Sequence, residues 1–500
     1  MNCSPLRCVL LLIPLAFACF AVSPTAQATC QQGCLTNGNT VLGDDALLNN
    51  TAFYNTAVGS QALFSNTIGP SNTAIGYKSL FSNTTGQDNT AIGWQALQSN
   101  TEGYNNTATG WSALAGNTSG AFNTAYGSSA LQFNTNGSNN TAMGWSALGG
   151  NSSGSGNTAI GWTALTSNFD GNDNTAIGLF ALHGNTSGSN NTANGASALF
   201  SNTNGINNTA SGFGALTSNT TGSSNTANGY QALANSSGSS NNTGIGFQAL
   251  FGNGSGHDNT AGGFQALFSN TNGHDNTAIG HNALQSNTTG DFNVALGANA
   301  GFNLTTGNNN IDIFNRGVAG ESNTIRIGKA ETHTATFIAG ISGATVPGGV
   351  GVIVDSSGHL GTTTSSARFK EAIKPMDKAS EAILALQPVT FHYKKELDPK
   401  AIAQFGLIAE DVEKINPDLV ARDEEGKPYS VRYEAVNAML LNEFLKEHKA
   451  FVEEQRIVQE QGTTIARQHK QIETLTVGLQ QVSAQLALSK AERQTVQNSQ

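Results

Sequence analysis

A chain of 500 residues has room for two to four domains, but its composition is unlike that of an ordinary soluble protein. Charged residues make up 11%, against roughly 25% in a typical soluble domain, and glycine contributes 58 residues. The hydrophobic content of 38% argues against a fully disordered chain. The formal net charge of −10 argues against nucleic acid as the main partner. Residues 361–500 hold 18 of the 23 Lys and Arg and 20 of the 33 Asp and Glu, so the chain divides near residue 360.

The N-terminal segment Met1–Ala28 has the pattern of a secretory signal peptide. Arg7 precedes the apolar run Val9–Val22, and Ala26-Gln27-Ala28 is the small-x-small pattern that a signal peptidase recognises. The run is short for a membrane span. A lipoprotein signal ending at Cys19 is a weaker alternative, because the usual upstream leucine is missing. We therefore predict a secreted or cell-surface protein whose signal is cleaved near Ala28.

Two cysteines, Cys30 and Cys34, remain after the predicted signal. An oxidising compartment would allow them to pair. Two cysteines without nearby histidine do not indicate a zinc site, so we predict neither a metal nor a cofactor. No second apolar stretch approaches membrane-spanning length, and the mature chain is predicted to lack a transmembrane segment.

The central part of the chain repeats every 17 residues, and asparagine marks the first position of each copy. The unit reads N-T-A-x-G-x-x-A-L-x-x-N-T-x-G-x-x. Position five is glycine from Gly59 to Gly297, and position nine is leucine from Leu63 to Leu284. The first positions are Asn55, Asn72, Asn89, Asn106, Asn123, Asn140, Asn157, Asn174, Asn191, Asn208, Asn225, Asn242, Asn259, Asn276, Asn293 and Asn310. A slip of one residue in the second turn is predicted near Asn235-Ser236.

Seventeen residues cannot enclose a core alone, so each unit must bury its apolar edge against the next one. Frequent Gly, Asn and Ser favour turns over helices. Residues 39–315 are therefore predicted to form a β-solenoid, with two short strands and two tight turns per coil and coils stacked at ~4.7 Å. Alanine and one leucine would point inward, Gly and Asn would take positive φ, and Asn at position one or twelve would form side-chain ladders.

Such a thin coil has a small core, and packing three chains side by side would bury more apolar area. Position four is apolar in many copies and polar in others: Ile75, Ile92, Met143, Ile160, Ile177 and Ile279 against Asn194, Ser211 and Asn228. The N-T-A-I-G units resemble the head repeats of trimeric bacterial adhesins and of some phage tail-fibre shafts. The resemblance implies a homotrimer.

Position six is aromatic in many copies and carries all four tryptophans: Tyr77, Trp94, Trp111, Trp145, Trp162, Phe213, Tyr230, Phe247 and Phe264. Stacked one coil apart, they would form an aromatic stripe. Flat exposed rings suit a cell-surface glycan or another host-surface ligand. Packing of the rings against a neighbouring chain or over the coil edge is the interpretation we favour, because interfaces are rich in Trp and Tyr.

Beyond the repeats, residues 316–364 form a β-rich connector with expected strands at Thr324–Ile327, Thr334–Ile341 and Gly351–Val354. Helical periodicity then marks Ala379–Leu386 and Ile408–Ile415, and Val389–Tyr393 is expected to be a strand. A long helix is predicted from about Glu434. Residues 451–490 carry a coiled-coil seam of alternating three- and four-residue steps at Val458, Gln461, Ile465, Gln468, Ile472, Leu475, Leu479, Val482 and Leu486.

Residues 365–450 resemble the intramolecular chaperone, self-cleaving domain at the C-terminus of endosialidase tailspikes and other phage tail fibres. Three motifs carry the resemblance: Ser365–Glu371 (SSARFKE), Phe405–Val412 (FGLIAEDV) and Val431–Ala435 (VRYEA). It implies an α/β domain that trimerises, guides folding of the preceding β-structured shaft and then removes itself.

In that family a Ser–Lys dyad cuts the bond before the serine, which implies that Ser365 and Lys370 are the catalytic residues here and that Thr364–Ser365 is the scissile bond. The following residue is often acidic in the phage domains and is Ser366 in this chain. A serine needs a base to become a nucleophile, and lysine can be that base only when burial or nearby cations lower its pKa. The alternative from the residues alone is that Lys370 is a solvated charge at a helix start, flanked by Ser365.

Three functional hypotheses follow. The first is an exported trimeric fibre or adhesin-like structural protein whose C-terminal domain assembles the shaft and releases itself. The second makes self-processing by a serine peptidase the defining activity. The third is a glycan-binding adhesin whose C-terminal trimerisation domain is uncleaved and purely structural.

Overall fold

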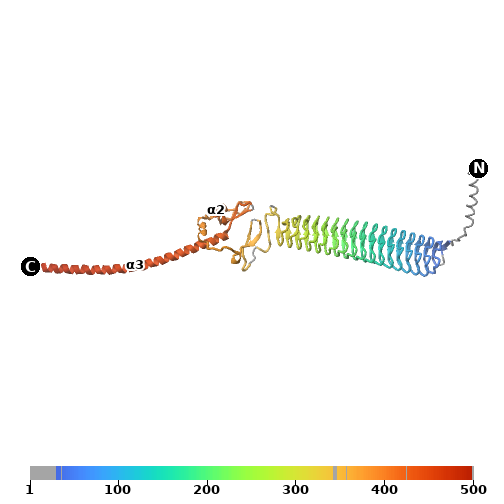
Figure 1. Ribbon diagram of the computed structural model, residues 1–500, viewed down its shortest axis with the longest axis horizontal. Coiled ribbons are helices and arrows are strands. Elements are labelled where there is room, and N and C mark those ends of the chain that lie inside the picture. Colours follow the sequence, from blue (N-terminus) through green and yellow to red (C-terminus); the bar gives the residue numbers. More distant parts are fainter. Residues whose placement is uncertain are drawn as a thin grey trace, which may run out of the picture. The chain divides into compact units, whose positions relative to one another are not determined.

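The computed structural model describes residues 30–34, 37–330, 332–341, 346–355, 357–423 and 425–497. The signal peptide predicted at Met1–Ala28 lies outside these residues. The chain divides into two compact units, one ending at Phe337 and the other beginning at Ile338 (Figure 1). Each unit is described by itself. Within the described residues, no helix combines the length and the apolar character that a membrane crossing requires.

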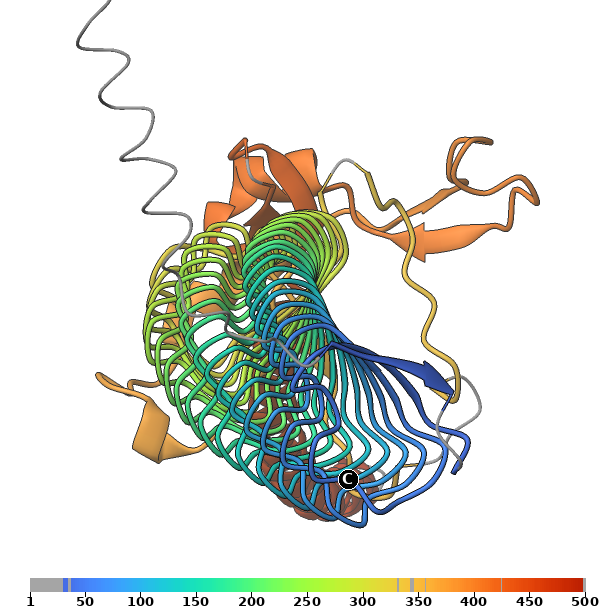
Figure 2. The same ribbon diagram turned by 90° about the vertical axis from the view of Figure 1, so that its right-hand side faces the viewer.

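The first unit is a β-solenoid built on one 19-stranded sheet. Its first strand, β1 (Cys30–Cys34), is antiparallel to β2 (Thr40–Asp44), and all later strands are parallel and pair in chain order. They are β3 (Thr56–Val58), β4 (Thr73–Ile75), β5 (Thr90–Ile92), β6 (Thr107–Thr109), β7 (Thr124–Tyr126), β8 (Thr141–Met143), β9 (Thr158–Ile160), β10 (Thr175–Ile177), β11 (Thr192–Asn194), β12 (Thr209–Ser211), β13 (Thr226–Asn228), β14 (Thr243–Ile245), β15 (Thr260–Gly262), β16 (Thr277–Ile279), β17 (Val294–Leu296), β18 (Ile311–Ile313) and β19 (Ile325–Ile327). Viewed along its axis, the solenoid shows coil after coil in superposition (Figure 2).

The predicted solenoid is confirmed, but each coil has one three-residue strand where two were expected. In the rest of the coil, the leucine at position nine adopts a left-handed backbone, with φ of 52° at Leu63. Positions seven and seventeen do the same, with φ of 59° at both Gln61 and Ser71. These residues bend the chain out of the extended conformation, so the rest of the coil is a succession of turns. The expectation that Gly and Asn would take positive φ is borne out at several turns, as at Asn139 with φ of 59° and Asn190 with φ of 60°.

Glycine at position five is required for two reasons. Gly59 has φ of 126°, a backbone that side chains rarely adopt. A Cβ there would also lie 2.7 Å from the carbonyl oxygen of Gly76 in the next coil. The repeated glycine therefore allows consecutive coils to approach at strand spacing.

The interior of the solenoid contains one leucine and two alanines per coil, as predicted. In the coil that begins at Asn157 these are Ala159, Ala164 and Leu165, each with 0% exposure. Equivalent residues of all the coils form one continuous apolar cluster from Val41 to Leu304. The position-four and position-six side chains lie outside it and are exposed.

Asparagine at position one forms a buried ladder along the solenoid. The backbone N–H and the Nδ2 group of Asn191 both donate to Oδ1 of Asn174, at 3.0 and 3.1 Å. In turn, Oδ1 of Asn191 accepts the same two bonds from Asn208. Nδ2 of Asn191 also donates to the carbonyl of Gly205 at 2.8 Å. The buried side-chain amide thus makes four hydrogen bonds, three of them to neighbouring coils.

Asparagine at position twelve forms a second buried ladder beside the first. Nδ2 of Asn202 donates to Oδ1 of Asn185 at 2.7 Å and to the carbonyl of Gly205 at 3.1 Å. The position-fifteen carbonyl therefore accepts from both ladders. Both ladders proposed from the sequence are confirmed, and they are joined within each coil.

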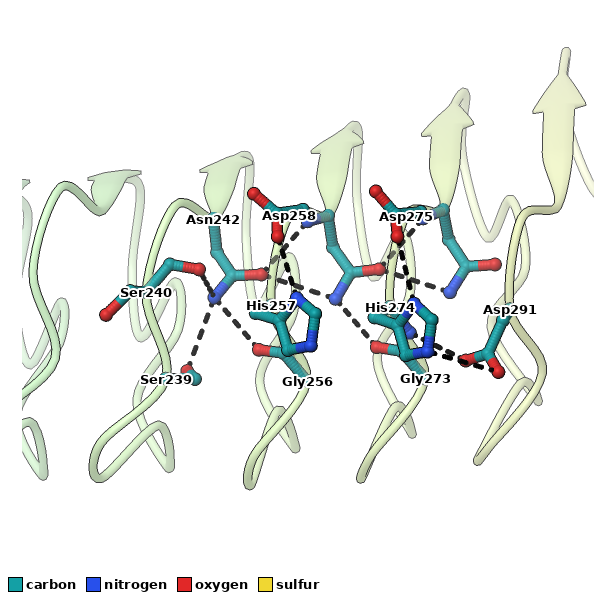
Figure 3. Close-up of polar contacts among 12 residues, drawn as sticks. Ser239, Ser240, Asn242, Gly256, His257, Asp258, Gly273, His274, Asp275 and Asp291 are labelled. Carbon is teal, nitrogen blue, oxygen red and sulfur yellow. Dashed lines mark hydrogen bonds and ion pairs between the residues drawn. The ribbon is translucent and has the colours of Figure 1, made fainter.

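One coil interrupts the second ladder. Ser236 occupies position twelve and Ser239 position fifteen, and their hydroxyl groups hydrogen-bond to each other. As a result, Oδ1 of Asn219 is buried without a partner, and Nδ2 of Asn253 donates instead to Oγ of Ser239 at 3.1 Å. The first ladder continues unbroken past this coil at Asn242 (Figure 3). The backbone register is unchanged, so the predicted one-residue slip was wrong.

Restoring this coil to the consensus is expected to stabilise the solenoid. The double substitution Ser236→Asn with Ser239→Gly would supply Asn219 with its missing donor, and an unsatisfied buried acceptor costs about 1–3 kcal/mol. We expect a gain of about 1–2 kcal/mol in urea unfolding. The matched control is Ser239→Gly alone, which leaves Asn219 unpaired and should give no gain; an unchanged or lower stability of the double variant would contradict the explanation.

The last two coils each change the polarity of one interior position. Leu304 replaces asparagine at position twelve of the coil that begins at Asn293, and Asp312 replaces alanine at position three of the coil that begins at Asn310. Asp312 is only 1% exposed, and neither carboxylate oxygen has a hydrogen-bond partner in the described structure. Arg326 lies opposite it across the β18–β19 pairing, but its guanidinium bonds Glu321 at 2.8 Å. Burial and the charge of Glu321 raise the pKa of Asp312 to about 6, against the opposing effect of Arg326.

The segments at the two ends of the solenoid differ partly from expectation. β1 holds Cys30 and Cys34 four residues apart on one strand, where Cα atoms would be roughly 13 Å apart, too far for a disulfide within the chain. β19 confirms the strand expected at Thr324–Ile327 and extends the sheet past residue 315. The strand expected at Thr334–Ile341 is absent from its described residues, which lack a regular partner strand.

The second unit combines small antiparallel pairs with helices. β20 (Val352–Val354) pairs with β21 (Leu360–Thr362), β22 (Val389–Phe391) with β23 (Gln404–Gly406), and β24 (Val420–Arg422) with β25 (Pro428–Val431). The helices are η1 (Ala367–Phe369), η2 (Asp377–Ala385), α2 (Ala409–Ile415), η3 (Pro417–Leu419) and α3 (Tyr433–Gln497). The predicted strands at 351–354 and 389–393 and the helix at 408–415 are confirmed, and η2 is a 3₁₀ helix where helical periodicity began at Ala379.

Candidate functional site in the C-terminal unit

The predicted dyad lies on an exposed segment between β21 and η2. Ser365 and Lys370 flank the single turn of η1, whose first and last backbone bonds run from Phe369 N–H to the carbonyl of Ser366 and from Lys370 N–H to the carbonyl of Ala367, both at 3.1 Å. Ser365 and Lys370 are both exposed. In this described segment, no hydrogen bond joins their side chains. The lone chain therefore brings the two residues onto one turn without assembling a nucleophile–base pair.

The side chain of Arg368, which lies between the two dyad residues in the sequence, contacts Phe369. Its guanidinium lies 4.6 Å from the centre of the Phe369 ring, in cation–π contact. Phe369 itself remains 58% exposed. Thr364, on the other side of the predicted scissile bond, is also exposed. The residues on both sides of the peptide bond before Ser365 are thus exposed.

The second and third sequence motifs meet in the folded domain. The backbone N–H of Leu407 donates to the hydroxyl of Tyr433 at 3.0 Å. A Cβ at Gly406 would lie 2.8 Å from that hydroxyl oxygen, so only glycine permits this contact. The backbone N–H of Arg432 donates to the carbonyl of Leu419 at 2.9 Å. These contacts explain why glycine and tyrosine stand at positions 406 and 433, and the bonds hold β23 and η3 to the start of α3.

A polar cluster that sequence reasoning missed joins η2 to α3. The side chain of Ser380 is fully buried, hydrogen-bonds Glu443, and accepts from Nδ2 of Asn442 at 2.6 Å and Nζ of Lys446 at 3.3 Å. Lys446 also pairs with Glu443 at 2.6 Å. The ammonium of Lys446 and the hydroxyl of Ser380 lower the pKa of Glu443. The only sequence signal was the Glu443–Lys446 spacing on α3, which does not reveal the distant serine.

The core of this unit is small. Among the described residues of this unit, the buried apolar cluster consists of Val412, Leu419, Val420 and Val431. Large apolar side chains remain exposed around it: Ile373 67%, Leu384 70%, Phe405 82% and Tyr429 77%. The seam predicted on α3 is also exposed, for example 62% at both Ile465 and Ile472. α3 confirms the long helix, and its pairing into a coiled coil stays a prediction.

Comparison with known families identifies the segment that begins at Ser365. Residues 365–421 match the family model of the chaperone of endosialidase. The match begins at the predicted first residue after the scissile bond and ends within β24, and the solenoid precedes it in the chain. No curated protein matches the chain at a significant level. The chaperone domain and the β-solenoid expected from the sequence are therefore both present in one polypeptide.

The aromatic stripe at position six is a stack of nearly parallel rings. Trp94 and Trp111 have centroids 5.3 Å apart and planes at 2°, and Phe247 and Phe264 have centroids 5.1 Å apart and planes at 6°. Each ring face inside such a stack is covered by the next ring. A sugar that packs on a ring face would find mainly ring edges here, so this geometry favours packing of the stripe against a protein surface over the glycan hypothesis.

Acidic and histidine side chains gather on another side of the late coils. Nδ1 of His257 pairs with Asp258 at 2.7 Å, and Nδ1 of His274 pairs with Asp275 at 2.9 Å, with the two imidazole rings stacked 4.9 Å apart (Figure 3). Among the residues that the structure describes, no group of three or more His, Cys, Asp or Glu is placed to hold a metal ion. Both His–Asp pairs are partly exposed at the surface of the solenoid.

Proposed function

We propose that the protein is an exported, trimeric, fibre-like structural protein whose C-terminal domain is an intramolecular chaperone for trimer assembly. The observation that carries the proposal is the match of residues 365–421 to the chaperone of endosialidase, in a chain that has a β-solenoid N-terminal to it. The small buried cluster and the exposed apolar side chains of the C-terminal unit support it, because such a surface is stabilised when copies of the chain cover it.

The proposal includes release of the C-terminal domain by a single cut before Ser365. The hydroxyl of Ser365 would attack the carbonyl carbon of Thr364 while Lys370 takes the hydroxyl proton. The C–N bond between Thr364 and Ser365 would then break, the Ser365 nitrogen would receive the proton from Lys370 and become a free amine, and water would hydrolyse the ester between Thr364 and the Ser365 oxygen. Lys370 is exposed in the single chain, so its activation as a base would require burial by a neighbouring copy. Cleavage would thereby follow assembly, which is the order that a removable folding aid needs.

Replacing either dyad residue is expected to abolish the cut. The full chain with Ser365→Ala or Lys370→Ala should remain one intact band on a denaturing gel, whereas the natural chain should give a fragment whose N-terminal residue is Ser365. Ser366→Ala is the matched control, because its side chain makes no cap hydrogen bond to η1, and it should still be cleaved.

Trimer formation is measured separately, by the native mass of the natural chain and of Ser365→Ala. A trimer without a fragment in the natural chain would leave the chaperone function and reject the cleavage. A monomer at all concentrations would reject the assembly function itself.

A further inference from the structure

One coil lacks its ring in the position-six stripe and exposes a ring elsewhere. In the coil that begins at Asn123, position six is Ser128, between Trp111 in the preceding coil and Trp145 in the following one. Position eleven of the same coil is Phe133, which is 62% exposed. Position eleven is Ser, Gly or Asn in the other coils: Ser65, Ser82, Ser99, Gly116, Gly150, Ser167, Gly184, Ser201, Ser218, Asn235, Gly252, Ser269, Ser286 and Asn303.

The missing ring leaves a slot bounded by two indole faces. Trp111 stacks on Trp94 and Trp145 stacks on Trp162, both at 5.3 Å, so their opposite faces look toward Ser128. Trp111 and Trp145 are each 50% exposed, against 41% for Trp94, which has a ring on both sides. Trp111 and Trp145 each follow the strand of their own coil, β6 and β8. Both strands pair with β7, so the two rings are expected to lie two strand spacings apart, roughly 9–10 Å.

A slot of that width accepts one aromatic ring. Within the stripe, adjacent rings stack at 5.1–5.4 Å, as between Phe213, Tyr230, Phe247 and Phe264. One added ring midway between Trp111 and Trp145 would have the same spacing to both. The stripe is also interrupted at Leu179 and Ala196, but that gap spans two coils. At its near end the face of Trp162 is already occupied, because Phe180 packs edge-on against it with ring centroids 4.8 Å apart. The slot at Ser128 is therefore the single-ring gap of the stripe.

We propose that Phe133 of a second copy of this chain fills the slot over Ser128 and fixes the axial register between neighbouring solenoids. The inference rests on the trimer of the proposed function and specifies how its subunits meet. A closed ring of three uses two different surfaces of each subunit, so the position-eleven side of one chain meets the position-six side of the next. Because the ring and the slot belong to the same coil, they meet only when the solenoids lie parallel and level.

Because the coils are nearly identical, a specific contact is needed to fix the axial register between neighbouring solenoids. Sixteen first-position asparagines recur at the same 17-residue step, so sliding one solenoid past another by one coil would leave most of the contacts alike. A single mismatched coil breaks this equivalence, because a slip would place Phe133 against an occupied part of the stripe or would leave the slot empty.

Chemical cross-linking tests the contact directly. A ring between the two backbones keeps cysteines at 128 and 133 too far apart for a disulfide, so a short bifunctional thiol reagent takes the place of the ring. In a full chain with its five cysteines changed to serine, Ser128→Cys with Phe133→Cys is expected to give covalent trimers on a denaturing gel after this treatment. The matched control, Ser128→Cys with Gly150→Cys, places the second thiol at position eleven one coil away and should give clearly less. Equal cross-linking of both pairs, or none of the same-level pair in a chain whose native mass is that of a trimer, would overturn the inference.

Coupled substitutions test the ring in the slot. Ser128→Trp fills the slot and is expected to reduce the trimer fraction, Phe133→Ser removes the inserted ring and lowers the thermal midpoint, and the two together should recover much of the trimer that Ser128→Trp loses. Ala196→Trp adds a ring elsewhere in the stripe and should leave the trimer unchanged. Strictly additive losses would overturn the inference, whereas a natural chain that is monomeric would instead reject the proposed function.

Discussion

Replacing Asn191 by alanine is expected to be among the most destabilising single changes in the solenoid. The side chain makes three hydrogen bonds to Asn174, Gly205 and Asn208, and Oδ1 accepts one more from the backbone of Asn208. Alanine would leave buried donors and acceptors unpaired on both neighbouring coils, and each such group costs about 1–3 kcal/mol. We expect a loss of about 3–5 kcal/mol in urea unfolding.

The control for this experiment lies three residues further along the same coil. Asn194 is at position four, its side chain is exposed, and Asn194→Ala is expected to change stability by less than about 0.5 kcal/mol. Similar losses from the two substitutions would show that the ladder contributes little. Because coils interact with their neighbours only, hydrogen exchange should reveal the loss mainly in the coils next to Asn191.

The second large effect is a pH-dependent penalty at Asp312. Its pKa is raised to about 6 in the folded chain from an ordinary 3.8, so the folded state binds a proton more tightly than the unfolded state. The penalty is absent below about pH 4, grows as the pH rises toward 6 and is complete above it. Two pH units correspond to about 3 kcal/mol at most, since each unit is about 1.4 kcal/mol.

Asp312→Ala, which restores the alanine of the other coils, is therefore expected to raise the thermal midpoint at pH 7.5 and to leave it nearly unchanged at pH 4. Asp291→Ala serves as the control, because that side chain is at the surface of the solenoid and its substitution should not show this pH dependence. A stabilisation of equal size at both pH values would mean that Asp312 acts through packing and not through its charge.

The fold of the repeat region could be predicted from the sequence because each copy carries the same local pattern of residues. A buried alanine, a buried leucine and two asparagines at fixed positions are enough to predict the solenoid, its core and its ladders. The backbone of Leu63 could not be predicted in the same way, because leucine seldom adopts a left-handed conformation and only the stacking of coils enforces it. The expected second strand was wrong for this reason.

The C-terminal unit could be predicted from its family motifs more than from the physical properties of its residues. Gly406 and Tyr433 are far apart in sequence, and nothing local to either residue indicates that a hydroxyl must approach a glycine. The cluster around Ser380 was missed for the same reason, because the hydrogen-bond partners of Ser380 lie more than sixty residues away in the sequence. Ser365 and Lys370 were found through the family resemblance, and the isolated chain does not bring their side chains together.

The direction of the asparagine ladders gives the shaft an electrical polarity. In the position-one ladder from Asn89 to Asn310, each side-chain amide donates toward the coil before it and accepts from the segment after it, and Oδ1 of Asn310 accepts from the backbone of Thr324. Two rows of aligned amide dipoles add along the axis, much as peptide dipoles add in a helix, with the negative end toward Asn310. The two tips of the rod are thus unlike in sign, so side-by-side rods pointing the same way repel slightly and must be held together by their apolar flanks.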